Sequence, residues 1–194
     1  MKVSKGTRIT LLVVLLLVID QVSKLLVKTN MSIGESIHVL GDWFQILFIE
    51  NNGMAFGLQF GEGWGKLTLS LLRIILIILI IFYMRRLLKK GDTPKGVMVG
   101  LAMILTGAIG NMIDSMFYGI IFDYAPFLYG KVVDMLYFPL IDTTWPQWLP
   151  WIGGKSFTFF DPVFNFADSC VTVGAFYLIL FQWKFFSQDE KKEA

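Results

Sequence analysis

The chain has 194 residues, of which 55% are hydrophobic and 16% are charged, and its formal net charge is +2. An ordinary soluble domain carries about 25% charged residues, so the composition argues against a soluble protein and favours a single membrane domain. One cysteine excludes an intrachain disulfide and leaves the redox compartment open.

The first predicted span covers residues 9–27. A basic segment precedes this apolar run, which is also how a signal peptide begins. No small-residue cleavage site follows it. Asp20, Gln21 and Lys24 come instead, so the sequence predicts an uncleaved first helix.

A small β-hairpin is predicted after the first span. Residues 37–40 and 43–49 read as short strands, and Gly41-Asp42 forms the turn between them. A glycine-rich turn over 61–65 then leads into the second span, residues 67–84. Arg73 is a lone cation in that span, which predicts an arginine that reaches the interface or pairs with an acid.

The third and fourth predicted spans cover residues 96–113 and 164–183. All four predicted spans are near the ~20 residues that cross ~30 Å of hydrocarbon. The fold class is therefore an all-α membrane protein of four transmembrane helices with a small extracytoplasmic β element, forming one domain over 1–194. Loops over 28–66 and 115–163 connect the spans on one side. Several tryptophans in these loops suit the lipid headgroups: Trp43, Trp64, Trp145, Trp148 and Trp151.

Basic residues orient the predicted spans. Most of them fall on the side that holds both termini and the loop between the second and third spans. Because cytoplasmic loops carry an excess of Lys and Arg, both termini are predicted to be cytoplasmic. The two long loops are then predicted to face outward.

Four acidic residues lie in or beside apolar sequence: Asp20, Asp114, Asp134 and Asp168. The predicted topology brings all four near the outer surface of the membrane. An ionised carboxylate costs roughly 2.5–3.5 kcal/mol at the centre of a membrane helix on insertion scales. Such groups therefore pair, meet water or do chemistry.

Other catalytic schemes fit poorly. A Ser-His-Asp triad would depend on His38, the single histidine, which lies in the predicted hairpin, and no His-Glu-x-x-His motif indicates a zinc peptidase. Cys170 reads as a small buried hydrophobe. Ser23 and Lys24 are helix neighbours that do not face each other, whereas Asp20 and Lys24 share a face and predict a structural or substrate-facing pair.

Two carboxylates held close together share one proton, and this pair can activate water and polarise a peptide carbonyl. The alternatives are helix caps, salt-bridge partners or an ion path. The rival class of protein is a transporter or channel whose outer acids bind a cation. A transporter favours internal repeats and discontinuous helices, and the sequence shows neither.

Five motifs in order resemble lipoprotein signal peptidase, also called signal peptidase II, over nearly the whole chain. They are Asp20-Gln-Val-Ser-Lys24, Asn51-Asn-Gly-Met-Ala-Phe56-Gly, Gly107-Ala-Ile-Gly-Asn111-Met-Ile-Asp114, Val133-Asp134-Met and Phe164-Asn165-Phe-Ala167-Asp168. Any one motif alone would be weak, and five in order are specific.

The resemblance implies an intramembrane aspartic peptidase of the bacterial inner membrane, with its active site facing outward. It implies removal of signal peptides from prolipoproteins, with the cut before a diacylglyceryl-modified cysteine. Asp134 and Asp168 match the catalytic pair. The residues that match pocket and support positions are Asp20, Lys24, Asn51, Gly53, Gly110, Asn111, Asp114, Asn165 and Ala167.

The resemblance also implies partners and moving parts. Expected partners are diacylated prolipoproteins, membrane lipid and cyclic peptide inhibitors such as globomycin, with no nucleic acid, no cofactor and no metal. The hairpin resembles the family's outer β-cradle. The stretch 51–57 resembles a loop that closes over substrate, and Gly53 is a possible hinge.

Two departures from the family pattern concern the surroundings of the pocket. Ser115 stands where most members have arginine, and Lys24 or Lys131 are possible replacements for the missing cation. The loops over 115–131 and 139–163 look longer than usual for the family. These departures affect substrate access and leave the predicted dyad unchanged.

Overall fold

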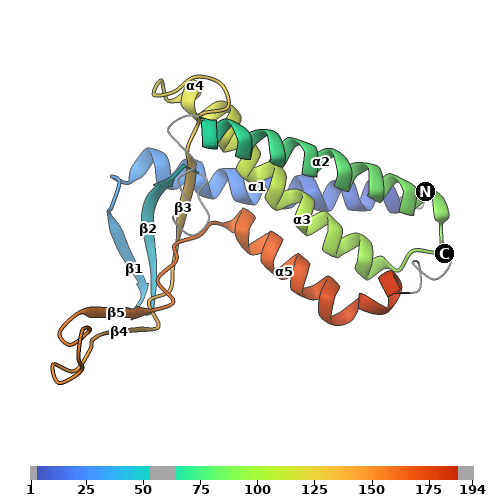
Figure 1. Cartoon of the computed structure of the whole chain (residues 1–194). Helices are drawn as coiled ribbons and strands as arrows, with labels where there is room; N and C mark the ends of the chain where they lie inside the picture. Colours follow the sequence, from blue (N-terminus) through green and yellow to red (C-terminus); the bar gives the residue numbers. More distant parts are fainter. Residues whose placement is uncertain (1–3, 53–63, 188–194) are drawn as a thin grey trace. The chain divides into compact units, whose positions relative to one another are not determined.

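The computed structural model describes residues 4–52 and 64–187 (Figure 1). The chain falls into two compact units. The helical unit comprises Met1–Ser23, Asn51–Val132 and Phe166–Ala194. The strand unit comprises Lys24–Glu50 and Val133–Asn165.

Long apolar helices dominate the helical unit. They are α1 (Lys5–Asn30), whose last turns belong to the strand unit, α2 (Trp64–Lys90), α3 (Lys95–Ile113) and α5 (Phe166–Phe181). Within the described residues, three helical stretches are long and apolar enough to cross a membrane, namely Lys5–Asn30, Gly65–Lys90 and Lys95–Ile121. A helix satisfies its own backbone hydrogen bonds, as hydrocarbon requires.

The predicted fourth span is shorter in the structure than in the sequence prediction. α5 has 16 residues, and at 1.5 Å per residue it reaches only ~24 Å of the ~30 Å hydrocarbon thickness. A bend at Gln182 ends it, and residues 183–187 form a further helical turn. The count of four transmembrane helices therefore stays a prediction.

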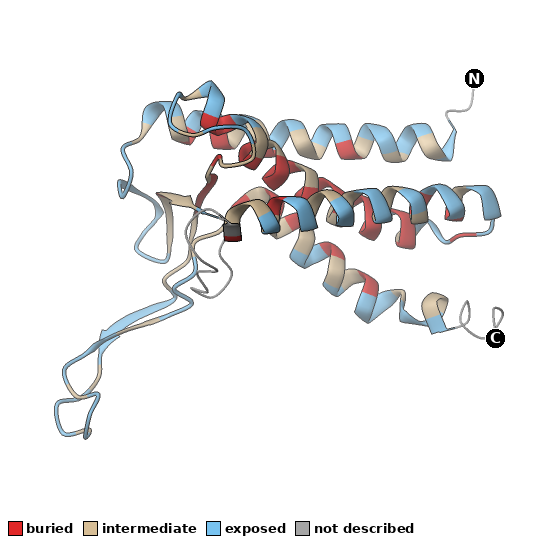
Figure 2. Cartoon of the chain, turned by 45° about the horizontal axis from the view of Figure 1, so that its top comes forward, coloured by how far each residue is buried: buried red, intermediate tan, exposed pale blue. Residues whose placement is uncertain are grey.

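α3 is the central helix of the helical unit. In the apolar window of the stretch that contains it, 67% of residues are buried, against 11% in α1 and in α2. Figure 2 shows this difference as buried residues on inner helix faces and exposed residues on outer ones. A side chain at Gly107 would put its Cβ 2.2 Å from the Ala167 carbonyl oxygen of α5. Small residues on α3 therefore permit a close approach to α5, as they do between membrane helices generally.

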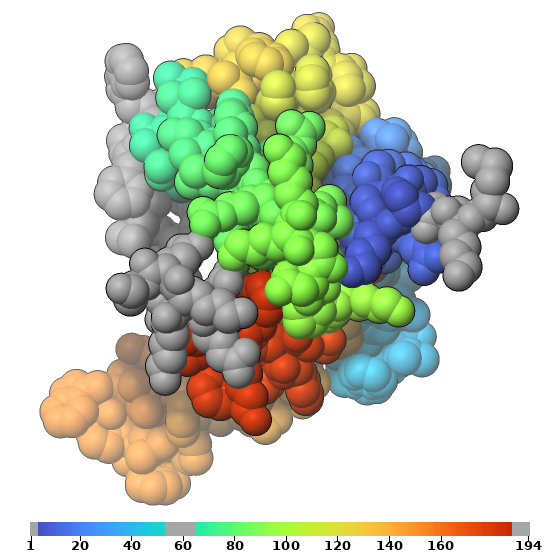
Figure 3. Space-filling model, turned by 90° about the vertical axis from the view of Figure 1, so that its right-hand side faces the viewer, coloured from blue at the N-terminus to red at the C-terminus, as the bar shows by residue number. Residues whose placement is uncertain are grey.

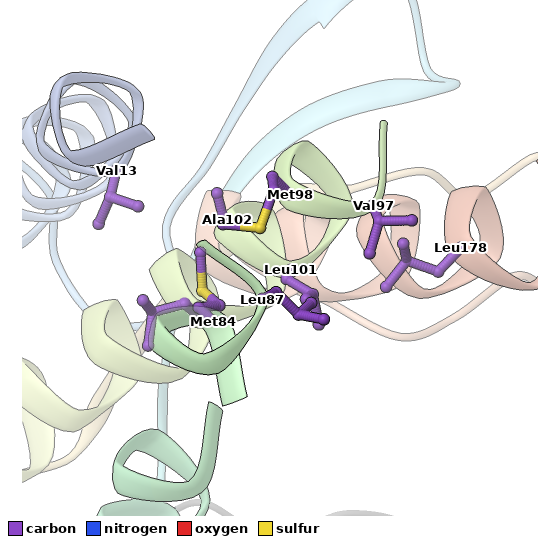
Figure 4. Close-up of a cluster of buried hydrophobic side chains, with 9 residues drawn as sticks. Val13, Met84, Leu87, Val97, Met98, Leu101, Ala102 and Leu178 are labelled. Carbon is purple, nitrogen blue, oxygen red and sulfur yellow. The ribbon is translucent and has the colours of Figure 1, made fainter. Parts of the chain in front are cut away.

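The apolar core of this unit is a cluster of buried side chains, shown in close-up in Figure 4. Its buried members come from four helices: Val13, Met84, Leu87, Val97, Met98, Leu101, Ala102, Leu105 and Leu178. Seen end-on, the residues that join α2 to α3 lie between the start of α1 and α5 (Figure 3). The core thus packs the four helices together near the connection between α2 and α3.

The helical stretch that contains α3 continues beyond Ile113. A π-helix, η1 (Asp114–Tyr118), and a short turn, α4 (Gly119–Ile121), continue it. The sequence assigned residues after Asp114 to a loop, so the helical stretch is longer than predicted. Single turns of π-helix are rare and occur frequently at functional sites.

The strand unit contains the predicted hairpin. β1 (Ser36–Leu40) pairs antiparallel with β2 (Phe44–Asn51), and Ser36 lies opposite Leu47. The turn uses Gly41 at φ +54, a left-handed conformation that glycine adopts without a Cβ penalty. This part of the fold prediction is confirmed.

Three further strands were not predicted. β3 (Val132–Tyr137) joins the hairpin in the order β1-β2-β3, and β4 (Ile141–Thr144) pairs antiparallel with β5 (Ser156–Phe159). β3 is buried over its first four residues, Asp134 included. The sheet therefore carries one of the candidate catalytic acids.

Candidate active site

Asp168 lies on the first turn of α5 and is half-buried. Its Oδ1 accepts a hydrogen bond of 2.7 Å from Asn111 Nδ2 of α3. A bond of this length between an amide and a carboxylate is typical of charge-assisted contacts. Asn111 therefore holds one candidate catalytic carboxylate within the helical unit.

Asp20 caps α5 from another helix. It is fully buried on α1, and its Oδ1 accepts a hydrogen bond of 2.9 Å from the Ala167 backbone N–H. The first N–H groups of a helix lack partners within that helix, and a negative charge near them is favourable. Asp20 thus fixes the turn of α5 that carries Asp168.

Gly110 makes room for this contact. A Cβ at Gly110 would lie 2.5 Å from Asp20 Oδ2 and 3.1 Å from the Ala167 Cβ. Both distances are shorter than an unstrained carbon contact of about 3.5–4.0 Å. The glycine is therefore required by close packing of α1, α3 and α5.

Ser115 stands where a basic residue was expected, and its hydroxyl accepts contacts from two basic side chains. Ser115 is fully buried, and its Oγ lies 3.2 Å from Arg73 Nη1 and 3.5 Å from Lys66 Nζ, both on α2. Lys131 Nζ lies 5.7 Å from the centre of the Tyr124 ring. Two cations beside Ser115 thus come from α2, and the replacement of the missing cation by Lys24 or Lys131 stays a prediction.

The sequence prediction missed two members of the polar network in the helical unit. Gln21 of α1 contacts both Asp20 and Asp114, and Tyr118 of η1 contacts Gln21. Asp114, the first residue of η1, is fully buried like Asp20. Gln21 stood inside the first motif, but an isolated polar residue beside an acid gave no signal of its own.

Asp134 lies within β3 of the strand unit and is 3% exposed. Its Oδ1 accepts a hydrogen bond of 2.7 Å from Asn165 Nδ2. Backbone N–H groups of Met135 and Leu136 both donate to the Phe164 carbonyl, at 3.0 and 2.7 Å. These bonds fix the strand that carries Asp134 against the segment that carries Asn165.

The remaining predicted site residues are Lys24, Asn51 and Gly53. Lys24 is fully buried on α1, and its pairing with Asp20 stays a prediction. Asn51 ends β2 and is half-buried. Gly53, the rest of the predicted lid over 53–57 and the turn residues 61–63 lie outside the described residues.

Three other reactive side chains are His38, Cys170 and Tyr137. His38 is exposed in the hairpin, with its Nδ1 3.1 Å from Asp42 Oδ1. Cys170 is buried at 3% exposure. Burial and a hydrogen bond of 3.2 Å to Asp161 raise the pKa of Tyr137 at the end of β3. Within residues 4–52 and 64–187, no three His, Cys, Asp or Glu side chains are grouped to hold a metal ion.

Comparison with known proteins assigns the chain to a family. The sequence model of signal peptidase (SPase) II matches residues 12–184. The lipoprotein signal peptidase of Porphyromonas gingivalis is 45% identical over 92% of this chain and 84% of that protein. The lipoprotein signal peptidase of Amoebophilus asiaticus is 43% identical over 92% of this chain and 78% of that protein.

Solved structures agree with this assignment. A bacterial membrane enzyme solved by the in meso method at 2.3 Å resolution superposes with a TM-score of 0.65. It is 26% identical, over 93% of this chain and 90% of that one. The chain therefore belongs to the signal peptidase II family of peptidases.

Proposed function

We propose that this peptidase removes signal peptides from diacylglyceryl-modified bacterial prolipoproteins, cutting before the lipidated cysteine. In this proposal Asp134 and Asp168 form an aspartic dyad. The observation that carries the proposal is that each of these carboxylates accepts a 2.7 Å hydrogen bond from an asparagine amide within its own unit. Such bonds fix the orientation of each carboxylate.

Chain connectivity supports a shared site for the two acids. Asn165, which donates to Asp134, precedes Asp168 by three residues. Whatever the arrangement of the two units, the chain keeps the Cα atoms of Asn165 and Asp168 within about 11 Å of each other. The donor to Asp134 and the second proposed catalytic acid are therefore close along the chain.

The dyad acts with one proton between its two carboxylates, because two adjacent carboxylates do not both ionise cheaply. Water adds to the scissile carbonyl, one of its protons passes to the ionised carboxylate, and the other carboxyl protonates the carbonyl oxygen. As the gem-diol breaks down, the carboxyl that took the proton from water gives it to the amine nitrogen, and the C–N bond breaks. A hydroxyl proton of the gem-diol returns to the dyad.

The membrane defines the substrate in this proposal. The chain forms one domain of four spans in the bacterial inner membrane, with both termini cytoplasmic and the dyad near the outer surface. Each buried methylene contributes ~0.8 kcal/mol, so two acyl chains hold the modified cysteine at a set depth. Cyclic peptide inhibitors such as globomycin then compete with the precursor for the same site.

The test is a gel-shift assay with purified diacylated prolipoprotein. Asp134→Asn and Asp168→Asn should each reduce cleavage by about 10⁴-fold or more, as loss of one member of a catalytic unit does. The amide keeps the size but neither accepts a proton from the attacking water nor donates one to the carbonyl oxygen as a carboxyl group does. Matched controls are Asp142→Asn on exposed β4, His38→Ala and Cys170→Ala, which should keep most activity.

Lipid dependence provides a second arm of the same assay. Precursor without the diacylglyceryl group should be a very poor substrate, because it lacks the acyl chains that fix its depth. Equal rates with modified and unmodified precursor would contradict the proposed substrate class, and substantial activity in either dyad variant would contradict the mechanism.

A further inference from the structure

Gln21 lies between two fully buried carboxylates in the helical unit. Its Nε2 is 3.0 Å from Asp20 Oδ2, 3.0 Å from Asp114 Oδ1 and 3.3 Å from the Gly110 carbonyl oxygen. A primary amide has two protons to donate, and the two shorter contacts use both. A buried polar group requires hydrogen bonds, and the Gln21 amide donates one to each of the two buried acids.

Tyr118 fixes the orientation of the Gln21 amide. The Tyr118 hydroxyl donates to Gln21 Oε1 at 3.3 Å, and Tyr118 is 2% exposed on η1. The opposite orientation of the amide would turn its oxygen toward two carboxylates, an arrangement with no donor on either side. The network therefore accepts a single orientation, with nitrogen toward the acids and oxygen toward the phenol.

The same network reaches Asp168 by two routes. Asp20 uses one oxygen for Gln21 and the other for the Ala167 N–H, one residue before Asp168. On α3, the Gly110 carbonyl contacts Gln21, and the next residue, Asn111, donates to Asp168. Gln21 thus contacts both the cap of α5 and the α3 segment that orients the Asp168 carboxylate.

We infer that Gln21, oriented by Tyr118, is a positioning residue for Asp168. It acts through Asp20, which caps the turn of α5 that carries the catalytic carboxylate. This role rests on the proposed function, because it matters for catalysis only where Asp168 is a member of the dyad.

The kinetic test replaces Gln21 by methionine, which keeps length and removes both donors. A misplacement of about 1 Å costs on the order of 10²-fold in rate, so kcat should fall by that order while KM stays within about twofold. A loss confined to kcat marks an interaction that matters in the transition state. Tyr118→Phe removes one oxygen and should produce a smaller fall.

A double variant distinguishes positioning from separate contributions. If Tyr118 acts through Gln21, Gln21→Met with Tyr118→Phe should be no slower than Gln21→Met alone, whereas independent effects multiply. The chain provides a matched control pair, since Gln182 Nε2 donates to the Tyr177 hydroxyl at 3.3 Å near the far end of α5. Gln182→Met and Tyr177→Phe should keep wild-type kcat.

Hydrogen–deuterium exchange of the folded, detergent-solubilised protein provides a readout apart from activity. Gln21→Met should speed exchange at the Ala167 amide and leave the Gln182 region unchanged. Wild-type kcat in Gln21→Met, equal losses in the control pair, or unchanged exchange at Ala167 would each overturn the inference. Should Gln21→Met fail to fold, the same criteria apply to Tyr118→Phe. Activity in Asp168→Asn would instead overturn the proposed function itself.

Discussion

The helical unit and the strand unit each hold one candidate catalytic carboxylate, and they support it differently. Asp168 is half-buried on a helix turn that is capped by a side chain from α1. Asp134 is almost fully buried in a strand that is fixed by backbone hydrogen bonds to Phe164. In both units the carboxylate Oδ1 accepts a 2.7 Å hydrogen bond from an asparagine Nδ2. Different folds thus provide the same local chemistry, and each carboxylate is oriented by groups of its own unit.

The two units also differ in what stabilises them. The helical unit relies on close contacts at glycines, whereas the strand unit contains a buried ion pair between Lys28 and Glu50 whose side chains are 8% and 9% exposed. Lys28 also lies over the Phe48 ring at 5.9 Å. Substitutions at the close-packed glycines should therefore lower the stability of the helical unit. Substitutions that remove the Lys28–Glu50 ion pair should lower the stability of the strand unit.

The largest effect on stability is expected from breaking that ion pair. Glu50→Gln leaves Lys28 without its carboxylate partner, and removal of one member of a buried pair costs about 3–5 kcal/mol. Exchange of the β1–β2 amides should rise accordingly. The double variant with Lys28→Met and Glu50→Leu should restore slow exchange. If Glu50→Gln is as stable as the wild type, the strand unit does not depend on this ion pair.

The two asparagines should respond alike. Asn111→Leu and Asn165→Leu each remove a hydrogen bond to a carboxylate, worth about 1.5–3 kcal/mol, so kcat should fall roughly 10- to 100-fold in each. The exposed Asn30 provides a control, and Asn30→Leu should leave kcat unchanged. A large fall in one variant with none in the other would show that the two carboxylates are not supported equivalently.

A single methyl group should destabilise the helical unit. Gly107→Ala places a Cβ against the Ala167 carbonyl, and overpacking of this kind costs typically about 1–3 kcal/mol. Gly6→Ala on α1 is the matched control, since its nearest foreign atom is 3.8 Å away. Thermal unfolding in detergent should separate the two variants, and equal melting temperatures would mean that α3 and α5 can move apart without cost.

The smallest effect is expected at the aromatic loop of the strand unit. Trp148 is 79% exposed, so Trp148→Ala should change stability by less than about 0.5 kcal/mol, as exposed substitutions do. As a predicted membrane anchor it should raise KM and leave kcat nearly unchanged. Trp145, which packs on Phe157 at 4.9 Å, is the contrasting position, where truncation should destabilise β4–β5. A fall in kcat for Trp148→Ala as severe as that of a dyad variant would contradict the anchor role.

Sequence reasoning identified the features that strong periodicity or specific motifs encode. The apolar lengths of α1, α2 and α3 and the turn at Gly41 gave clear signals. β3 was not predicted because its first four residues are all buried. Such a strand lacks the alternation of apolar and polar residues that marks a half-buried strand. η1 was not predicted because a π-turn depends on tertiary contacts, and no characteristic amino-acid composition marks a π-helix.

The sequence predicted the acids and supporting residues of the candidate site, but it did not predict which of them are hydrogen-bonded to one another. The motifs named Asp20, Asn111 and Asn165, but sequence spacing does not tell which amide donates to which carboxylate across helices 57 residues apart, as Asn111 does to Asp168. Gln21 was missed for the same reason, because its partners Asp114 and Tyr118 lie far along the chain. Contacts between distant segments depend on packing that no local pattern reports.

The most direct test compares the single and double dyad variants under saturating diacylated prolipoprotein. We expect Asp134→Asn, Asp168→Asn and the double variant to lose activity to nearly the same extent, because the two carboxylates work as one unit and removal of either disables it. Hydrogen exchange of each variant should match the wild type outside the changed position. Independent losses that multiply in the double variant, or substantial cleavage by either single variant, would contradict the claim that one carboxylate from each unit forms the catalytic pair.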